Sequence, residues 1–263
     1  MKTLIIGDTH LMNEIIIPFV DIALKKHEIN RVVMVGDYVD QWGMENNYQL
    51  YLRELEFLKK WKSEMEFAGI EVVNLVGNHD IPHMTGIPMY YSLQNLDFFD
   101  IVGKKLLDLG VQVAYQLDDF VISHAGYAIG YGPEEWNMSL LMEKDMTKLD
   151  ELHAQAGKSR GGRNTYGGPV WADFNRDLVD YFNPDIPKQI VGHTPQSTIN
   201  FVNHDQIIGV DTFSLAGSLL PVSDGSMLLY QQGGMEVIEN PTWKTMETCD
   251  KLLKHFGLED MLK

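Results

Sequence analysis

Short polar segments follow apolar runs at five places along this chain of 263 residues, and this pattern constrains the fold more than any other feature. Such apolar runs are typical of buried strands. In chain order, the polar segments are Gly7-Asp8-Thr9-His10, Gly36-Asp37-Tyr38-Val39-Asp40, Gly77-Asn78-His79-Asp80, Ser123-His124-Ala125-Gly126 and Gly192-His193-Thr194-Pro195. Because α/β folds bind ligands beyond the ends of their strands, the pattern predicts functional residues on the rim of a sheet.

The residue types in these segments indicate a metal site. The strand ends together offer Asp, Asn and His side chains. Hard oxygen and borderline nitrogen ligands in this mixture suit divalent ions. Each short segment alone is a weak signal that occurs by chance, whereas five in one order, each after a strand, are specific. The sequence therefore predicts a site for one or two divalent metal ions.

The spacing of apolar residues predicts the order of the elements. Helices are expected over residues 13–28 and 47–68, between the first three strands, and this alternation predicts a parallel central sheet. A helix is also expected over the charged residues 134–156, followed by a flexible glycine-rich loop at 157–168. Later strands that would include a hairpin and a second sheet are expected at 111–116, 119–123, 188–191, 198–202, 206–211 and 226–231.

The five segments resemble the signature of the calcineurin-like metallophosphoesterases. Gly192-His193-Thr194-Pro195, with Val210-Asp211-Thr212 after it, is most similar to the protein-phosphatase and diadenosine-tetraphosphatase branch. The resemblance implies an α/β fold in which a two-sheet β-sandwich is flanked by helices. We expect a single domain over residues 1–263, with an inserted helix-loop segment near 127–170 and a C-terminal helix near 241–257.

The resemblance also implies a dinuclear centre that hydrolyses a phosphate ester by attack of a metal-bridging hydroxide. Asp8 and His10 would hold one ion, and Asp37 would bridge both. The second ion would be completed by three further ligands, Asn78, His124 and His193. The two divalent ions are expected to be Mn²⁺, with Fe, Zn or Ni as alternatives.

A proton donor for the leaving group is expected beside the metals. His79 directly follows the ligand Asn78, so it would lie next to the centre without binding a metal. By resemblance, His79 would be the general acid, and Asp40 would orient or charge it. The remaining histidines lack the setting after a strand and are interpreted as structural or solvent-facing; they are His27, His83, His153, His204 and His255.

The chain departs from the branch at the position of its phosphate-binding arginine. Gln41 stands there, and an amide lacks the charged two-pronged contact of a guanidinium. Arg160 and Arg163, in the glycine-rich segment, are candidate replacements, although a solvated loop is an equally good interpretation. Pro195 replaces the second histidine that many diesterases of the superfamily carry, which favours the phosphatase branch.

Composition limits the partners and the surroundings. The net charge of −16 argues against a non-specific nucleic-acid binder, which needs a basic face. Cys249 is the only cysteine, no apolar run is long enough to span a membrane, and the N-terminus leads directly into a strand. These features predict a cytoplasmic protein without membrane attachment and leave the oligomeric state open, while the resemblance implies a phosphorylated substrate, either a phosphoprotein or a nucleotide.

Three functions compete at this stage. The first is a phosphomonoesterase similar to protein phosphatases. The second is a nucleotide hydrolase that acts on dinucleoside polyphosphates or a phosphodiester. The third is a non-catalytic scaffold for protein binding, which ranks lowest because a scaffold is expected to lose metal ligands, and this chain keeps all six together with the Asp40–His79 pair.

Overall fold

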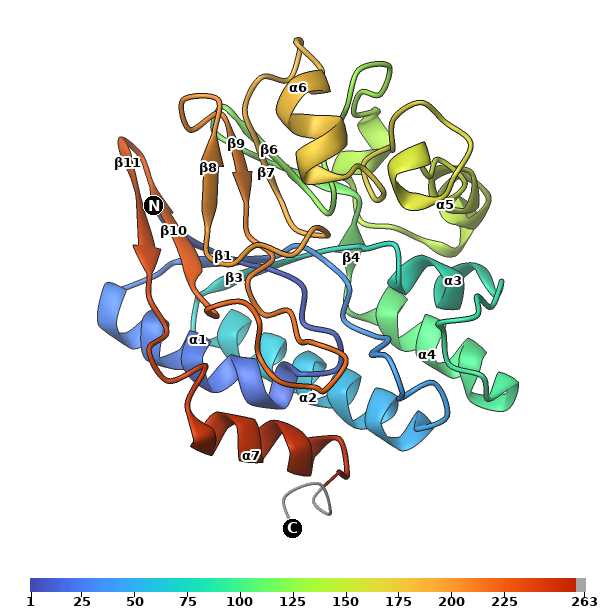
Figure 1. Ribbon diagram of the computed structural model, residues 1–263, viewed down its shortest axis with the longest axis vertical. Helices are drawn as coiled ribbons and strands as arrows, with labels where there is room; N and C mark the ends of the chain where they lie inside the picture. The colour runs from blue at the N-terminus through green and yellow to red at the C-terminus, as the bar shows by residue number, and fades with distance from the viewer. Residues whose placement is uncertain (259–263) are drawn as a thin grey trace.

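The computed structural model describes residues 1–258 and contains two β-sheets packed face to face, with helices on their outer sides (Figure 1). The strand order is β11-β10-β1-β2-β3-β4 in the first sheet and β5-β6-β7-β9-β8 in the second. The strands are β1 Lys2–Ile6, β2 Arg31–Met34, β3 Glu71–Leu75, β4 Val111–Gln112, β5 Ala114–Leu117, β6 Phe120–Ser123, β7 Gln189–Val191, β8 Asn200–Val202, β9 Ile207–Gly209, β10 Met227–Gln231 and β11 Gly234–Ile238. This architecture confirms the predicted α/β fold of two sheets flanked by helices.

The first sheet has the predicted parallel centre. β1, β2, β3 and β4 are parallel neighbours, so their carboxyl ends meet at one edge of the sheet. β10, which was expected in the second sheet, instead pairs antiparallel with β1, with Leu4 opposite Leu229. In this position Leu229 is buried against the helices and Leu228 between the sheets.

The strand expected over residues 111–116 is two strands in different sheets. Val111 pairs with Asn74 of β3, and Ala114 pairs with Ser123 of β6. The chain changes sheets at Val113, whose amide donates to the carbonyl of Asn137 instead of a strand partner. The tight hairpin between β5 and β6 is confirmed.

The helices expected over residues 13–28 and 47–68 are present, whereas the helices Asp80–Thr85 and Leu96–Asp108 were not expected and the charged segment 134–156 does not form one helix. The helices are α1 Asn13–His27, α2 Tyr48–Phe67, α3 Asp80–Thr85, α4 Leu96–Asp108, α5 Met146–His153, α6 Val179–Tyr181 and α7 Met246–His255. Only α5 and two short 3₁₀ turns, Glu135–Met138 and Glu143–Asp145, form in the charged segment. The amide of Leu141 donates to the carbonyl of Val111, and this contact holds the intervening chain extended beside β4.

The C-terminal helix α7 begins five residues later than the expected start near 241. Trp243 is fully buried in the turn before it, and the Thr245 side chain accepts a hydrogen bond from the amide of Thr248, which fixes the first turn. Leu252 and Leu253 are buried against the body, as expected. Within residues 1–258, no helix combines the length and the apolar content needed to cross a bilayer.

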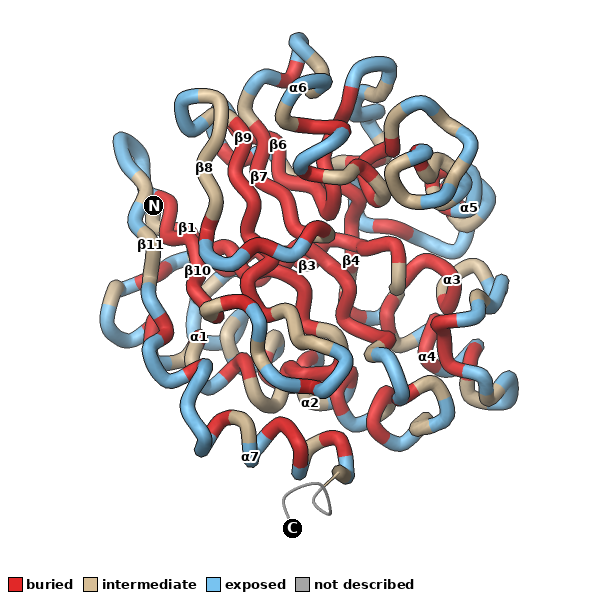
Figure 2. The backbone as a smooth tube through the Cα atoms, in the orientation of Figure 1, coloured by how far each residue is buried: buried red, intermediate tan, exposed pale blue. Residues whose placement is uncertain are grey.

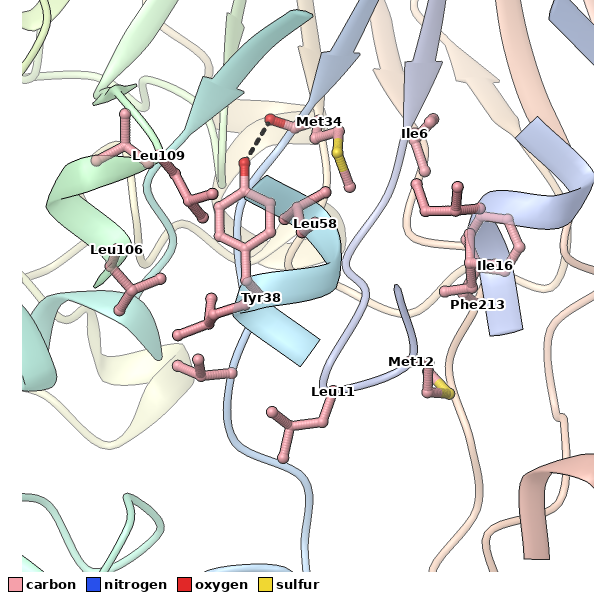
Figure 3. Packing of buried hydrophobic residues seen from close by; sticks show 14 of the residues in the cluster. Ile6, Leu11, Met12, Ile16, Met34, Tyr38, Leu58, Leu106, Leu109 and Phe213 are labelled. Carbon is pink, nitrogen blue, oxygen red and sulfur yellow. Dashed lines mark hydrogen bonds between the residues drawn. The ribbon is translucent and has the colours of Figure 1, made fainter. Parts of the chain in front are cut away.

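Buried side chains form one layer between the sheets and another between the first sheet and its helices. The buried backbone runs through the strands at the middle of the molecule, while the outer loops are exposed (Figure 2). Ile5 and Val33 face the second sheet, whereas Met34 faces the helices. Figure 3 shows Tyr38 in the helix-side layer near Leu58, where its hydroxyl donates to the carbonyl of Met34 over 3.3 Å. This buried anchor follows the candidate ligand Asp37 directly and fixes the position of that loop.

Candidate active site

The loops after five strands, β1, β2 and β3 of one sheet and β6 and β7 of the other, bring the predicted metal ligands together. One group consists of Asp8, His10 and Asp37, and a second of Asp37, His124 and His193. Within each group the donor atoms all lie within 4.8 Å of one another. Asp37 belongs to both groups, which is the arrangement that a bridging carboxylate requires.

The backbone at three of these residues is left-handed. His10 has φ 40°, Asp37 has φ 54° and His193 has φ 63°. Side chains other than glycine adopt such values uncommonly and at an energetic cost. The strain is concentrated where the chain must turn sharply after a strand, and it points each side chain back into the site.

Two imidazoles are oriented by backbone carbonyls. The Nδ1 atom of His10 lies 2.7 Å from the carbonyl of Asp40, and Nδ1 of His124 lies 3.0 Å from the carbonyl of Val35. These contacts favour the tautomer with the proton on Nδ1, in which the lone pair of Nε2 is available to a metal ion. Nε2 of His10 lies 3.8 Å from Oδ2 of Asp37, and Nε2 of His124 lies 3.3 Å from the same oxygen.

The remaining two predicted ligands complete the second group. Oδ1 of Asn78 lies 2.9 Å from Nε2 of His124, and Nδ1 of His193 lies 3.2 Å from that nitrogen. Burial, together with the charge of Arg160, lowers the pKa of His193, so this imidazole is neutral. A neutral imidazole is the form that binds metals. The convergence of lone pairs from Asp, Asn and His on one small volume fits a divalent cation.

Buried negative charge supports the same conclusion. Asp8, Asp37 and Asp211 are each at least 97% buried, and the carboxylates lie close enough to influence one another. Burial and the nearby charge of Asp211 raise the pKa of Asp8 well above its usual value. Like charges held together away from water are costly unless cations compensate them. The donor set therefore fits two divalent ions, as the sequence predicts.

Asp80 shapes the bridging loop. Its carboxylate accepts hydrogen bonds from the amides of Asp37 at 2.8 Å, Tyr38 at 2.9 Å and Gly77 at 2.9 Å. Burial and the charge of Asp37 raise the pKa of Asp80 to about 7. This residue ties the loops after β2 and β3 together.

Three motif glycines allow close approaches at the site, two of them to ligand carboxylates and one to a neighbouring backbone. A Cβ atom on Gly77 would collide with the Asp37 carboxylate, and one on Gly192 would collide with the Asp8 carboxylate. A Cβ atom on Gly7 would meet the backbone of Val210. The absence of a side chain at these positions thus permits the close approach of neighbouring strand ends.

The predicted acid pair is present. Nδ1 of His79 lies 3.2 Å from Oδ2 of Asp40, and the amide of His79 donates to Oδ1 of Asp37 over 2.8 Å. The other oxygen of Asp40 accepts from the Tyr51 hydroxyl at 2.8 Å and faces Nε2 of His83 at 2.9 Å. Asp40 is 2% exposed, so these contacts hold a buried carboxylate against His79.

His83 and Tyr51 belong to the site although the sequence analysis did not place them there. The spacing of His79 and His83, four residues apart at the start of α3, was the available signal, because such residues share one helix face. His153 also lies at the site and lines its larger cavity. These three residues come from helices, so a search restricted to strand ends misses them.

The three candidate substrate contacts differ in their position relative to the cavity. Arg160 lines the cavity beside His193, its Nη2 donates to Oγ1 of Thr194 over 2.6 Å, and its Nε lies 3.1 Å from Oδ2 of Asp173. Gln41 lines the same cavity. Arg163 is exposed, and among the described residues it lines neither this cavity nor the larger one. The structure thus brings Arg160 and Gln41 to the site and leaves Arg163 outside it.

Residues 1–197 match the calcineurin-like phosphoesterase family, so this chain belongs to that family. A 70-residue segment is 39% identical to Shewanella-like protein phosphatase 2 of Arabidopsis thaliana, and it spans 27% of this chain and 16% of that protein. The crystal structure of a cold-active protein-tyrosine phosphatase from a psychrophilic Shewanella species has a TM-score of 0.54 and 18% identity, and the match covers 90% of this chain and 80% of that one. The family confirms the predicted resemblance, and the structural likeness confirms the fold.

Proposed function

We propose that this protein is a metal-dependent phosphomonoesterase that removes phosphate from phosphorylated proteins. The observation that carries the proposal is the pair of ligand groups that share Asp37, with the Asp40–His79 pair directly beside them. This combination provides places for two cations, a proton donor and a cationic side chain, Arg160, around one cavity.

The six predicted ligands would hold two divalent ions, with Mn²⁺ as the first candidate and Fe, Zn and Ni as alternatives. Bound there, the ions would supply positive charge for the phosphoryl oxygens and lower the pKa of the attacking water. Asp37 would offset part of the repulsion between the two ions. His10 and His124, oriented by backbone carbonyls, would add ligation without further negative charge.

His79 would donate a proton to the leaving oxygen, because it lies at the cavity and its amide is tied to Asp37. Asp40 would hold the imidazole in position through the 3.2 Å contact. Arg160 would bind a phosphoryl oxygen, taking the place of the arginine that the branch carries where this chain has Gln41. Its ion pair with Asp173 limits the orientations of the guanidinium.

The named relatives favour a protein substrate over a nucleotide. One relative is named a protein phosphatase and the other a protein-tyrosine phosphatase. Pro195, in place of a second histidine, also fits a monoesterase better than a diesterase. A dinucleoside polyphosphate or a phosphodiester therefore becomes the alternative substrate in the experiment that tests the proposal.

The experiment compares substrates on one preparation. The purified protein is stripped with a chelator, reloaded with Mn²⁺, Zn²⁺, Fe²⁺ or Ni²⁺, and assayed on a phosphopeptide, nitrophenyl phosphate, a bis-nitrophenyl diester and a dinucleoside tetraphosphate. We expect the highest kcat/KM on the monoesters, and loss of all activity in Asp37→Asn. A higher kcat/KM on the diester or the dinucleotide would contradict the proposal.

A further inference from the structure

Two imidazoles of one helical segment face a single carboxylate behind the active site. His79 is the residue before α3, and His83 lies inside that helix, four residues later. Nδ1 of His79 lies 3.2 Å from Oδ2 of Asp40, whereas Nε2 of His83 lies 2.9 Å from Oδ1. The Tyr51 hydroxyl donates to the same Oδ1 over 2.8 Å. The two oxygens of Asp40 therefore differ, because Oδ1 is held by two groups and Oδ2 faces the proposed proton donor.

The contacts of Oδ1 determine where Oδ2 points. The torsion that orients a carboxylate is soft, so the group can turn and exchange its two oxygens unless hydrogen bonds hold it. An ionised carboxylate only accepts hydrogen bonds, so the contact with His83 requires the proton on Nε2 of that imidazole. Donors from His83 and Tyr51 together favour the one orientation of Asp40 in which Oδ2 faces His79.

The ring of His83 is fixed by the packing of α3 on α4, which lie side by side (Figure 1). His83 is 1% exposed, and its ring centroid lies 4.4 Å from that of Phe99 in α4. A Cβ atom on Gly103, also in α4, would collide with the backbone carbonyl of His83, so the two helices approach closely there. The place of His83 behind Asp40 is thus set by the contact between these helices.

The second nitrogen of His83 indicates a role in the site. Nδ1 is buried and has no hydrogen-bond partner within residues 1–258. A buried polar atom without a partner destabilises the folded state and calls for an explanation. An apolar side chain beside Phe99 would avoid this cost, but it would leave Oδ1 of Asp40 with Tyr51 alone. The histidine therefore makes sense as a donor to Asp40.

We infer that His83 is a positioning residue for the proton donor, because it holds the Asp40 carboxylate in the orientation that keeps the imidazole of His79 directed for proton transfer. The inference rests on the proposed function and adds a residue to it. Among the described residues that line the two cavities at the site, His83 is absent, so it does not contact the substrate. Its effect passes through Asp40 and His79.

The first test compares a poor with a good leaving group. His83→Leu should lower kcat on a phosphoserine peptide roughly 10- to 100-fold, the usual effect of losing a hydrogen bond that orients a functional side chain. The loss on nitrophenyl phosphate should be much smaller, because that leaving group hardly needs a proton. The amide nitrogen of glutamine can take the place of Nε2, so His83→Gln should restore most of the activity. KM and metal content should stay near the wild-type values in both variants.

A double variant tests whether His83 acts through His79. In the His79→Asn background, His83→Leu should cause no further loss of kcat, because the side chain that it positions is already absent. His27→Leu is the matched control, since His27 lies in the last turn of α1 and its Nε2 is also buried without a partner in the described chain. Equal losses on the two substrates, loss of metal, or an additional loss in the His79→Asn background would overturn the inference.

A readout that needs no turnover separates this inference from the proposed function. Nitrogen-15 NMR of the histidine side chains shows which ring nitrogen carries the proton. In the metal-free protein, at a pH where the ring is neutral, His79 should carry its proton on Nδ1, facing Asp40; His83→Leu should mix the two tautomers, and His83→Gln should not. This pattern in a protein that hydrolyses no phosphate ester would reject the proposed function and keep the positioning role. An unchanged His79 tautomer in His83→Leu would overturn the inference.

Discussion

Within residues 1–258, carboxylates and imidazoles gather in two places, one mostly buried and one partly exposed, and the two clusters use the same residue types in different ways. One is the metal-ligand cluster at the strand ends around Asp37. The other, which we call the helix cluster, consists of Glu14 of α1, Glu54 of α2 and His255 of α7, and its donor atoms also lie within 4.8 Å of one another. Composition and distance alone do not distinguish the two.

The imidazole of the helix cluster has no free nitrogen. Nε2 of His255 donates to the carbonyl of Leu11 over 2.7 Å, and Nδ1 accepts from Nη2 of Arg53 over 3.2 Å. Glu54 is fully buried, and burial together with the charge of Glu14 raises its pKa to about 8, so it is largely protonated at neutral pH. A neutral acid beside an imidazole whose two nitrogens are both engaged offers a cation neither a negative charge nor a nitrogen lone pair.

The metal-ligand cluster is open because backbone carbonyls engage only one nitrogen of His10 and one of His124. The other nitrogen of each ring points at the carboxylates. The difference shows that a metal site depends on the direction of the lone pairs, and that the groups holding the ligands determine this direction.

The largest expected effect separates the two clusters directly. Asp37→Asn should lower kcat/KM by more than about 10⁴-fold, because one substitution removes the shared charge from both ligand groups and several kcal/mol of charge stabilisation with it. Asp8→Asn should mainly weaken the binding of one of the two metal ions. Metal content per protein, measured by elemental analysis, checks this, with Glu54→Gln as the matched control in the helix cluster. Equal metal loss in Asp37→Asn and Glu54→Gln would show that both clusters bind metal.

The second effect concerns His79, the proposed proton donor. His79→Asn should lower kcat roughly 10²- to 10⁴-fold on a phosphoserine peptide while metal content stays near that of the wild type, because His79 is not a ligand. The loss should shrink on nitrophenyl phosphate, whose leaving group hardly needs a proton. A comparison of kcat on the two substrates checks the role, and an equal loss on both would reject it.

A smaller effect is expected from the phosphate contact. Arg160→Ala should raise KM about tenfold, since a hydrogen bond to a charged group contributes roughly 1.5–3 kcal/mol. Arg163→Ala is the matched control, because that exposed side chain lies outside the cavity. Steady-state kinetics of both variants and of the double mutant measure the effect. An equal rise of KM in the two single variants would indicate long-range attraction instead of a direct contact.

The last effect is on stability, leaves activity aside, and sharpens the account of the helix cluster. Glu54 ionises near its usual 4.5 in the unfolded chain and near 8 in the folded one, so the folded protein holds the extra proton and its unfolding free energy falls as pH rises between these values. Below about pH 6.5 the lowered pKa of His255, caused by burial and Arg53, acts in the opposite direction. Between pH 6.5 and 8, wild type should therefore lose about 2 kcal/mol relative to Glu54→Gln. Chemical denaturation at several pH values gives the slope of unfolding free energy against pH for the wild type and for Glu54→Gln. Parallel slopes between pH 6.5 and 8 would mean that Glu54 is ionised in the folded state.

Residues fixed by local sequence were predictable. The strand-end position of Asp8, His10 and the other four ligands follows from an apolar run and the turn after it, and the structure brings all six together. The first two helices were predictable for the same reason, since their apolar stripes repeat with the helical period.

Features that depend on distant partners were not predictable. The split between β4 and β5 depends on the contact of Val113 with Asn137, and the interrupted helix depends on the contact of Leu141 with Val111. His83 reaches Asp40 only because α3 folds back against the loop after β2. Each of these contacts joins segments whose separation is set by the whole fold, and only the His79–His83 spacing gave a local sign of one of them.

The motif glycines determine which substitutions the site can tolerate. Gly77 and Gly192 offer no lone pair, no charge and no proton, yet their empty space is occupied by the carboxylates of Asp37 and Asp8. An added methyl group there would keep every donor atom in the sequence and still displace two of them. Substitution of Gly77 or Gly192 is therefore expected to damage the site, although neither residue carries a reactive group.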